Sequence, residues 1–205
     1  TQRLNSGSPR SSPTEEKPMQ KSEISEIAEE LRKTYGIVSP QKLCEYLGIG
    51  LAYMNLGTGS DCIKGLSRTD CRCSSIIINE NLNEKQTAFT IYHEIGHILL
   101  GHTVKSTCAC MSVFSRDETL NLEVEANEFV AEYLMDTEET LQVLKETDSF
   151  FEAASVMRVP PVIMDFKWRM LKARGLVTVD APIYSRRECI KYDLFNGLDV
   201  DYFDF

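Results

Sequence analysis

The segment HEIGH places two histidines four residues apart, with a glutamate directly after the first. On a helix, positions four apart lie one turn above each other, so His93 and His97 can present both imidazoles to one metal ion. Glu94 then projects beside that ion as a general base. This set is typical of zinc-dependent peptide hydrolysis, in which zinc polarises the scissile carbonyl and activates a water whose proton the glutamate takes.

The plain alternative is a helix whose histidines serve packing or lie exposed by accident. The chain has only three histidines in 205 residues, so two of them framing a glutamate in this pattern is a rare chance event. The segment is also apolar, and two unpaired imidazoles there would be costly without a ligand. The sequence therefore favours a metal site.

A catalytic zinc needs a third protein ligand and an open fourth position. His102 lies five residues after His97 and does not match the spacing that brings a third histidine to the metal. We interpret His102 as a surface residue or as a hydrogen-bonding partner of a ligand. The third ligand must then come from another element.

The acidic segment EVEAN offers that ligand. Glu123 and Asn127 are four apart and share a helix face, which would supply a carboxylate ligand and a partner to orient a histidine. Glu125 points roughly 200° away from Glu123 on an ideal helix, so only one of the two can face the ion. Spacing alone leaves the choice between them open, as it does the alternative that these acids form a solvated helix face.

Hydrophobic spacing predicts the elements that position these residues. Asn83 and Gln86 resemble a capping box, and they start an apolar helix that ends at Gly101. A second long helix, about Thr119–Met135, carries the acids. The remaining elements are helices at about 22–35, 40–48, 137–145, 150–157 and 161–175, and strands at about 49–56 and 74–80.

Composition narrows the setting. The net charge of −9 and pI near 4.9 argue against a surface that grips phosphate backbones, so direct nucleic-acid binding is not expected. No apolar stretch is long enough for a membrane helix, and the first residues lack the core of a signal peptide. Seven cysteines cannot all pair within one chain, so we expect mostly reduced thiols. Together these observations predict a soluble cytoplasmic protein with no membrane partner.

Several blocks together resemble the ImmA/IrrE-type metallopeptidases of bacteria and their mobile elements. The likeness runs over about residues 22–175, and it includes KLCEYLGI, IKGL, SSIIINENL, QTAFTIYHEIGHILLGH and EVEANEFVAEYLMD. HEIGH alone is shared by many metallopeptidases, whereas its pairing with an ExEANxF block is more specific. Tyr92 stands where the family usually has alanine, and Asp136 stands where it commonly has proline.

The resemblance implies one catalytic zinc held by His93, His97 and Glu123, with Glu94 as the catalytic base and Asn127 orienting a ligand. It also implies a zinc metalloendopeptidase, and family members are associated with cleavage of helix-turn-helix repressors of phages or mobile elements. Two alternatives are a non-catalytic regulatory binding module of the same fold and a stress-response regulator peptidase.

We therefore predict an α+β fold, with a helical, glutamate-zincin-like peptidase core, a small β-sheet and a C-terminal helical appendage. The expected divisions are a disordered tail or expression remnant at 1–17, the metallopeptidase core at 18–147, a helix-turn-helix-like appendage at 148–176 and an acidic aromatic tail at 177–205. Basic residues give the appendage local positive charge, but the global acidity favours a packing role: Lys167, Arg169, Lys172 and Arg174.

Two close cysteine pairs could form a four-thiolate zinc site if their loops meet: Cys71 with Cys73, and Cys108 with Cys110. Structural zinc sites use CxxC spacing more often than CxC. We therefore favour loop cysteines without a common role.

Overall fold

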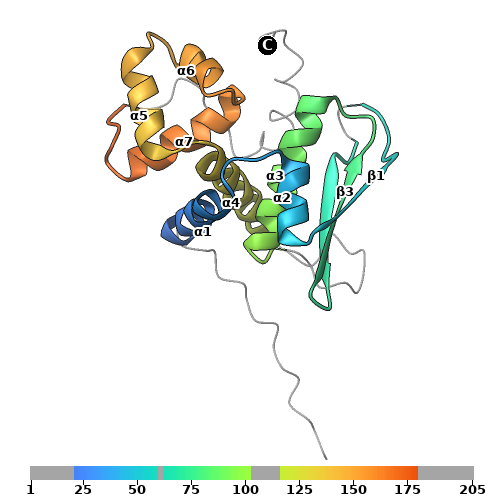
Figure 1. The fold of residues 1–205 in the computed structure, drawn as a ribbon. Helices are drawn as coiled ribbons and strands as arrows, with labels where there is room; N and C mark the ends of the chain where they lie inside the picture. Colours follow the sequence, from blue (N-terminus) through green and yellow to red (C-terminus); the bar gives the residue numbers. More distant parts are fainter. Residues whose placement is uncertain (1–20, 60–61, 103–115, 180–205) are drawn as a thin grey trace, which may run out of the picture.

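The structure, a computed structural model, describes residues 21–59, 62–102 and 116–179. These residues form a mixed α+β fold, as the sequence predicts, with seven helices and one three-stranded sheet (Figure 1). The elements in chain order are α1 (Lys21–Tyr35), α2 (Pro40–Leu47), β1 (Gly50–Met54), β2 (Gly65–Asp70), β3 (Cys73–Asn79), α3 (Glu84–Leu99), α4 (Arg116–Leu134), α5 (Thr137–Glu146), α6 (Phe150–Val156) and α7 (Pro161–Ala173).

The sheet has the order β1-β3-β2, with β1 parallel and β2 antiparallel to the central strand β3. Ile76 and Ile78 of β3 are fully buried, because this strand has a neighbour on both sides and a helical layer on one face. Sequence reasoning found β1 and β3 but missed β2. The hairpin between β2 and β3 turns at Cys71 and Arg72, which both have positive φ. Such turns are usually signalled by glycine or asparagine, and this one contains neither.

Helix α3 starts at the predicted capping box. The Asn83 side chain accepts a hydrogen bond from the Gln86 backbone N–H at 2.8 Å, and the Gln86 side chain accepts from the Asn83 N–H at 3.2 Å. These bonds satisfy two donors that the first turn would otherwise leave unpaired. Ile91 and Ile95 are fully buried, so α3 is a central element, as expected.

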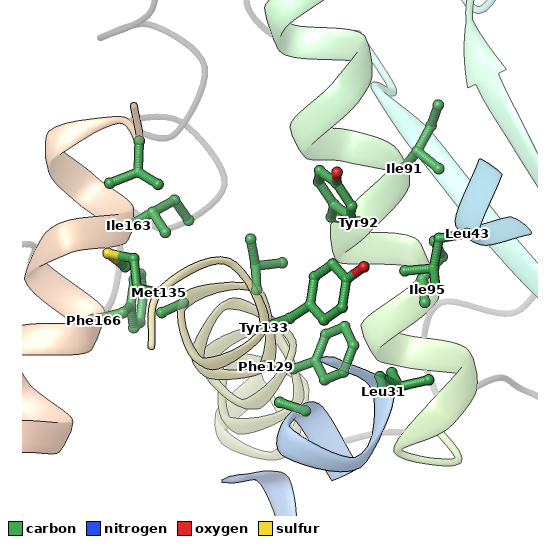
Figure 2. Packing of buried hydrophobic residues seen from close by; sticks show 14 of the residues in the cluster. Leu31, Leu43, Ile91, Tyr92, Ile95, Phe129, Tyr133, Met135, Ile163 and Phe166 are labelled. Atoms are coloured by element: carbon green, nitrogen blue, oxygen red, sulfur yellow. The ribbon is translucent and has the colours of Figure 1, made fainter. Parts of the chain in front are cut away.

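Helix α4 lies between α3 and the α5–α7 group (Figure 1). In Figure 2 its two sides serve different neighbours: Phe129 and Tyr133 lie toward α3, whereas Met135 lies beside Ile163 and Phe166 of the C-terminal region. All five side chains are at most 2% exposed. The helix that carries the predicted acidic ligand is therefore held by packing on both sides.

Two tyrosine hydroxyls attach the link between α1 and α2 to this core. The Tyr92 hydroxyl donates to the Val38 carbonyl at 2.6 Å, and the Tyr133 hydroxyl donates to the Gly36 carbonyl at 2.9 Å. Burial raises the pKa of both Tyr92 and Tyr133, so each phenol is a neutral donor at neutral pH. Tyr92 therefore helps to fix the link between α1 and α2.

A buried ion network joins α7 to α4. Lys167 is fully buried and donates to Glu132 at 3.0 Å and to the Thr137 hydroxyl at 3.1 Å. Arg174 binds the same Glu132 oxygen at 3.1 Å. Because Lys167 points inward, it is not available to a phosphate backbone, and this supports the packing role predicted for the last helix over a DNA-binding one.

Some predictions fall outside the described residues: the tail at 1–17, Cys108 with Cys110, and residues 180–205 of the acidic aromatic tail. Cys71 and Cys73 are exposed free thiols on the hairpin. The division into a core and an appendage stays a prediction. Within the described ranges, no helix has both the length and the apolar character to cross a membrane.

Gly96, inside HEIGH, sets the distance between α3 and α4. A Cβ at this position would lie 3.0 Å from Phe129 Cδ1 and 3.2 Å from the Ala126 carbonyl oxygen. One of those contacts is helix backbone, which cannot turn away as a flexible side chain can. A side chain at residue 96 would therefore have to push Phe129 or the α4 backbone away by a few tenths of an ångström.

Replacing Gly96 by alanine should lower the free energy of unfolding by about 1–3 kcal/mol, because the added methyl group overpacks the helix contact. Urea denaturation measures the change. Gly50→Ala is the matched control, since a Cβ there meets its neighbours at an ordinary 3.7 Å. Equal stability of the two variants would contradict the assigned role of Gly96.

Candidate metal centre

Helices α3 and α4 bring three predicted ligand residues together. His93 Nε2 lies 3.0 Å from His97 Nε2 and 3.2 Å from Glu123 Oε2, and His97 Nε2 lies 3.9 Å from Glu123 Oε1. The three side chains are 13–16% exposed, so the group is sheltered but reachable. Within the described part of the chain, His93, His97 and Glu123 form the group whose ligand atoms lie close enough together, within 4.8 Å of one another, to hold a metal ion.

The spacing fits zinc. Ligand atoms about 2.0–2.2 Å from a tetrahedral zinc lie about 3.3–3.6 Å from one another. The observed separations of 3.0, 3.2 and 3.9 Å bracket that distance. Two imidazole nitrogens and one carboxylate also form the donor set of known catalytic zinc sites. The residues present therefore suit the metal that the sequence predicts.

Asn127 lies against the first histidine. Its Oδ1 lies 2.9 Å from His93 Nδ1, and the residue is fully buried. Among the described residues, the buried amide Nδ2 has no hydrogen-bond partner. The contact of Oδ1 with His93 is therefore the described hydrogen bond of this amide.

His102 takes the second of its two expected positions, as a hydrogen-bonding partner of His97, and Glu125 does not lie on a solvated helix face. The side chains of His102 and Glu125 are only 4% and 9% exposed. His102 Nδ1 lies 3.2 Å from His97 Nδ1, and His102 Nε2 lies 3.0 Å from Glu125 Oε2. Neither residue belongs to the three-residue ligand group, which agrees with the geometry expected for Glu125.

Glu94 follows His93 in α3 and is 8% exposed. Strand β2 passes directly beside it, since a Cβ on Gly65 would lie 2.6 Å from Thr90 Cγ2 and 3.3 Å from Glu94 Cγ. A side chain at residue 65 would displace α3 from the sheet. Sequence reasoning did not single out Gly65, because its role depends on contact with a helix 25 residues later.

The electrostatics of the group centre on His93. Burial opposes protonation of this imidazole, but the hydrogen bond and charge of Glu123, the charge of Glu94 and the Asn127 contact outweigh it. Together they raise the pKa of His93 above its ordinary value of 6.5. His93 is therefore protonated more readily than a free histidine.

Comparison with known proteins gives the family. The model of the peptidase M78 family, described as the IrrE N-terminal-like domain, matches residues 44–169. The chain belongs to this family. The IrrE-like match starts in α2 and ends in α7, so it includes α3, α4 and all residues of the candidate metal centre.

The IrrE-like domain also has a similar phage protein. The chain is 31% identical over 142 residues to "Uncharacterized immunity region protein 2" of Bacillus phage phi105. The alignment covers 67% of this chain and 84% of the phage protein. The family resemblance predicted from the sequence is therefore confirmed.

Zinc binding to the IrrE-like site should weaken as the pH falls. Zinc needs neutral His93, so below the raised pKa of His93 the affinity should drop by about tenfold per pH unit for each displaced proton. The stability of the metal-free protein should change with pH in the opposite direction. The pair of protonated His93 and ionised Glu123 stabilises the fold below about pH 6.5, and this contribution is lost as the pH rises through the raised pKa of His93. Chelator competition between pH 6 and 8 measures the affinity, and a pH-independent affinity would contradict the assignment.

Proposed function

We propose that this IrrE-like chain is a zinc metalloendopeptidase with a glutamate-zincin-like core. His93, His97 and Glu123 would hold one catalytic zinc, and Glu94 would act as the general base. The observation that carries the proposal is the convergence of two imidazole nitrogens and one carboxylate, with a second buried carboxylate next to them in the same helix. A purely structural zinc site has no need of that base beside an open coordination position.

A zinc ion in this group would polarise the scissile carbonyl and the attacking water, supplying the Lewis acid of the reaction. Glu94 accepts the proton of that water and passes it to the amine of the leaving peptide. Asn127 keeps the ring of His93 in place during this cycle. The buried position of Glu94 strengthens its interaction with nearby charge, because little water screens it.

Strand β2 is suited to hold the substrate. Among the described residues it pairs only with β3, so its other edge can accept a further strand. Gly65, at the start of β2, lies next to Glu94, since a Cβ on Gly65 would be 3.3 Å from Glu94 Cγ. An extended peptide pairing with β2 would therefore lie beside the catalytic base.

The substrate we propose is a helix-turn-helix repressor of a phage or mobile element. The similar protein of phage phi105 is named for an immunity region, which fits a role in the control of phage genes. The net charge of −9 also suits a basic, DNA-binding partner. Cleavage of such a partner would place this chain in a gene-control circuit without direct contact with DNA.

Two variants separate metal binding from catalysis. Glu94→Gln should keep the fold and one zinc per chain yet lose about 10²–10⁴-fold in cleavage rate, because it removes a charge without changing shape. Glu123→Ala should lose zinc, whereas Glu125→Ala with zinc in excess should keep one ion per chain. Elemental analysis and a cleavage assay measure both. Full activity of Glu94→Gln would mean that another group activates the water.

The substrate is tested by mixing the purified protein with the repressor encoded beside its gene. We expect zinc-dependent cleavage at one or a few bonds, faster at low ionic strength because salt screens the attraction between acidic and basic surfaces. Denatured casein should stay nearly intact. Digestion of casein without cleavage of the repressor would reject this substrate and leave the zinc-peptidase proposal standing.

A further inference from the structure

His102 and Glu125 form a buried extension of the metal centre. A continuous path of contacts runs from Glu125 Oε2 to His102 Nε2 at 3.0 Å, and from His102 Nδ1 to His97 Nδ1 at 3.2 Å. Both side chains are at least nine-tenths buried. The three residues come from three parts of the chain: Glu125 from α4, His102 from the segment after α3, and His97 from α3 itself.

The backbone after α3 explains how His102 reaches this position. Gly101 has φ +77°, the left-handed conformation that glycine adopts without strain. The His102 N–H donates to the His97 carbonyl at 2.8 Å, and the Gly101 N–H donates to the Ile98 carbonyl at 3.2 Å. These two bonds are those of a Schellman motif, which folds the chain back over the last turn of a helix. The turn therefore places the His102 ring beside the His97 ring.

When Glu125 is ionised and the His102 ring is neutral, the chemistry of the three groups sets the direction of each hydrogen bond. A carboxylate only accepts, so His102 Nε2 must carry the proton that it donates to Glu125. In the neutral ring, His102 Nδ1 is then a bare acceptor, and its partner His97 Nδ1 must be the donor. His97 is thereby left with a bare Nε2, which is the nitrogen that faces His93 and Glu123.

The opposite assignment would close the metal site. If His102 Nδ1 carried a proton, His97 Nδ1 would have to accept it and the neutral His97 ring would carry its own proton on Nε2. That proton would point at His93 and Glu123, where a metal is proposed to bind. Asn127 has the same effect on His93, because its Oδ1 accepts a hydrogen bond from His93 Nδ1–H and leaves His93 Nε2 without a proton. Both ligand histidines thus have a dedicated acceptor on Nδ1.

We propose that His102 and Glu125 are positioning residues that hold His97 with its proton on Nδ1, so that Nε2 stays available to zinc. The inference rests on the proposed function, because it takes His97 as a ligand. Hydrogen-bonding partners behind a ligand histidine contribute about 10–100-fold to metal affinity. Loss of His102 should therefore weaken zinc binding although His102 does not contact the proposed metal position.

The protonation pattern can be observed directly by NMR of the zinc-loaded protein with ¹⁵N-labelled histidine. The chain has only three histidines, so six ring nitrogens have to be assigned. We expect His97 and His93 with a proton on Nδ1, and His102 with a proton on Nε2 and a bare Nδ1. A His102 ring with a proton on Nδ1 would overturn the proposal.

Substitutions test the consequence for the metal. In His102→Leu, zinc should dissociate about 10–100-fold faster and the His97 Nδ1 proton should exchange faster with water. His102→Asn keeps an oxygen acceptor near the former Nδ1 position, so it should restore the His97 Nδ1 signal and most of the slow dissociation. Glu125→Gln can no longer enforce donation by His102 and should speed zinc release by about tenfold.

Glu132→Gln is the matched control. It alters a buried glutamate of the same helix, whose partners Lys167 and Arg174 lie away from the metal centre. It should lower stability without changing zinc release or the His97 signal. Equal zinc release by His102→Leu and Glu132→Gln would reduce His102 to a packing role and overturn the proposal. A wild-type chain that takes up no zinc would instead reject the proposed function, which keeps the two failures distinct.

Discussion

The close contact between α3 and α4 is the constraint on which the rest of the site depends. The ligand group takes two side chains from α3 and one from α4, so its geometry can be no better defined than the distance between the two helices. Gly96 sets that distance on one side of α3, and Gly65 allows the sheet to approach on the other. A shift of about 1 Å at either contact would separate groups that must act together.

Helix α4 shows how a buried helix can carry many acids. Glu123 lies at the ligand group, Glu125 at His102, and Glu132 at Lys167 and Arg174. Each carboxylate has a positively charged or hydrogen-bonding partner on another element, which offsets the cost of removing it from water. The apolar contacts of Phe129 and Tyr133 fill the spaces between. The acids therefore fix how α4 is rotated as well as what it can bind.

Much of the fold and site could be predicted because the signals were local. The capping box at Asn83, the four-residue spacing of His93 and His97, and the shared face of Glu123 and Asn127 all depend on short stretches of chain. The resemblance to a family then chose Glu123 over Glu125, which spacing had left open. The structure places Glu123 in the ligand group and turns Glu125 to His102, although ligation itself remains a proposal.

The features that escaped prediction depend on contacts between distant segments. Strand β2 lacks a recognisable turn, since its hairpin uses two non-glycine residues with positive φ. The role of His102 requires Glu125, which lies 23 positions later on another helix. Lys167 gave a misleading signal of surface charge, because a lysine that neutralises a buried glutamate has the same letter in the sequence as one that faces water.

That lysine also has a bearing on where the folding unit ends. Removing α7 would take away Lys167 and Arg174, the two cations that neutralise Glu132, together with the helix that packs on this side of α4. The C-terminal helix α7 and its C-cap thus supply the positive charges that neutralise Glu132 of α4, the helix that also carries Glu123. Trimming the chain directly after the candidate metal centre would remove this counter-charge, so the smallest stable fragment must be longer than the segment that contains the centre.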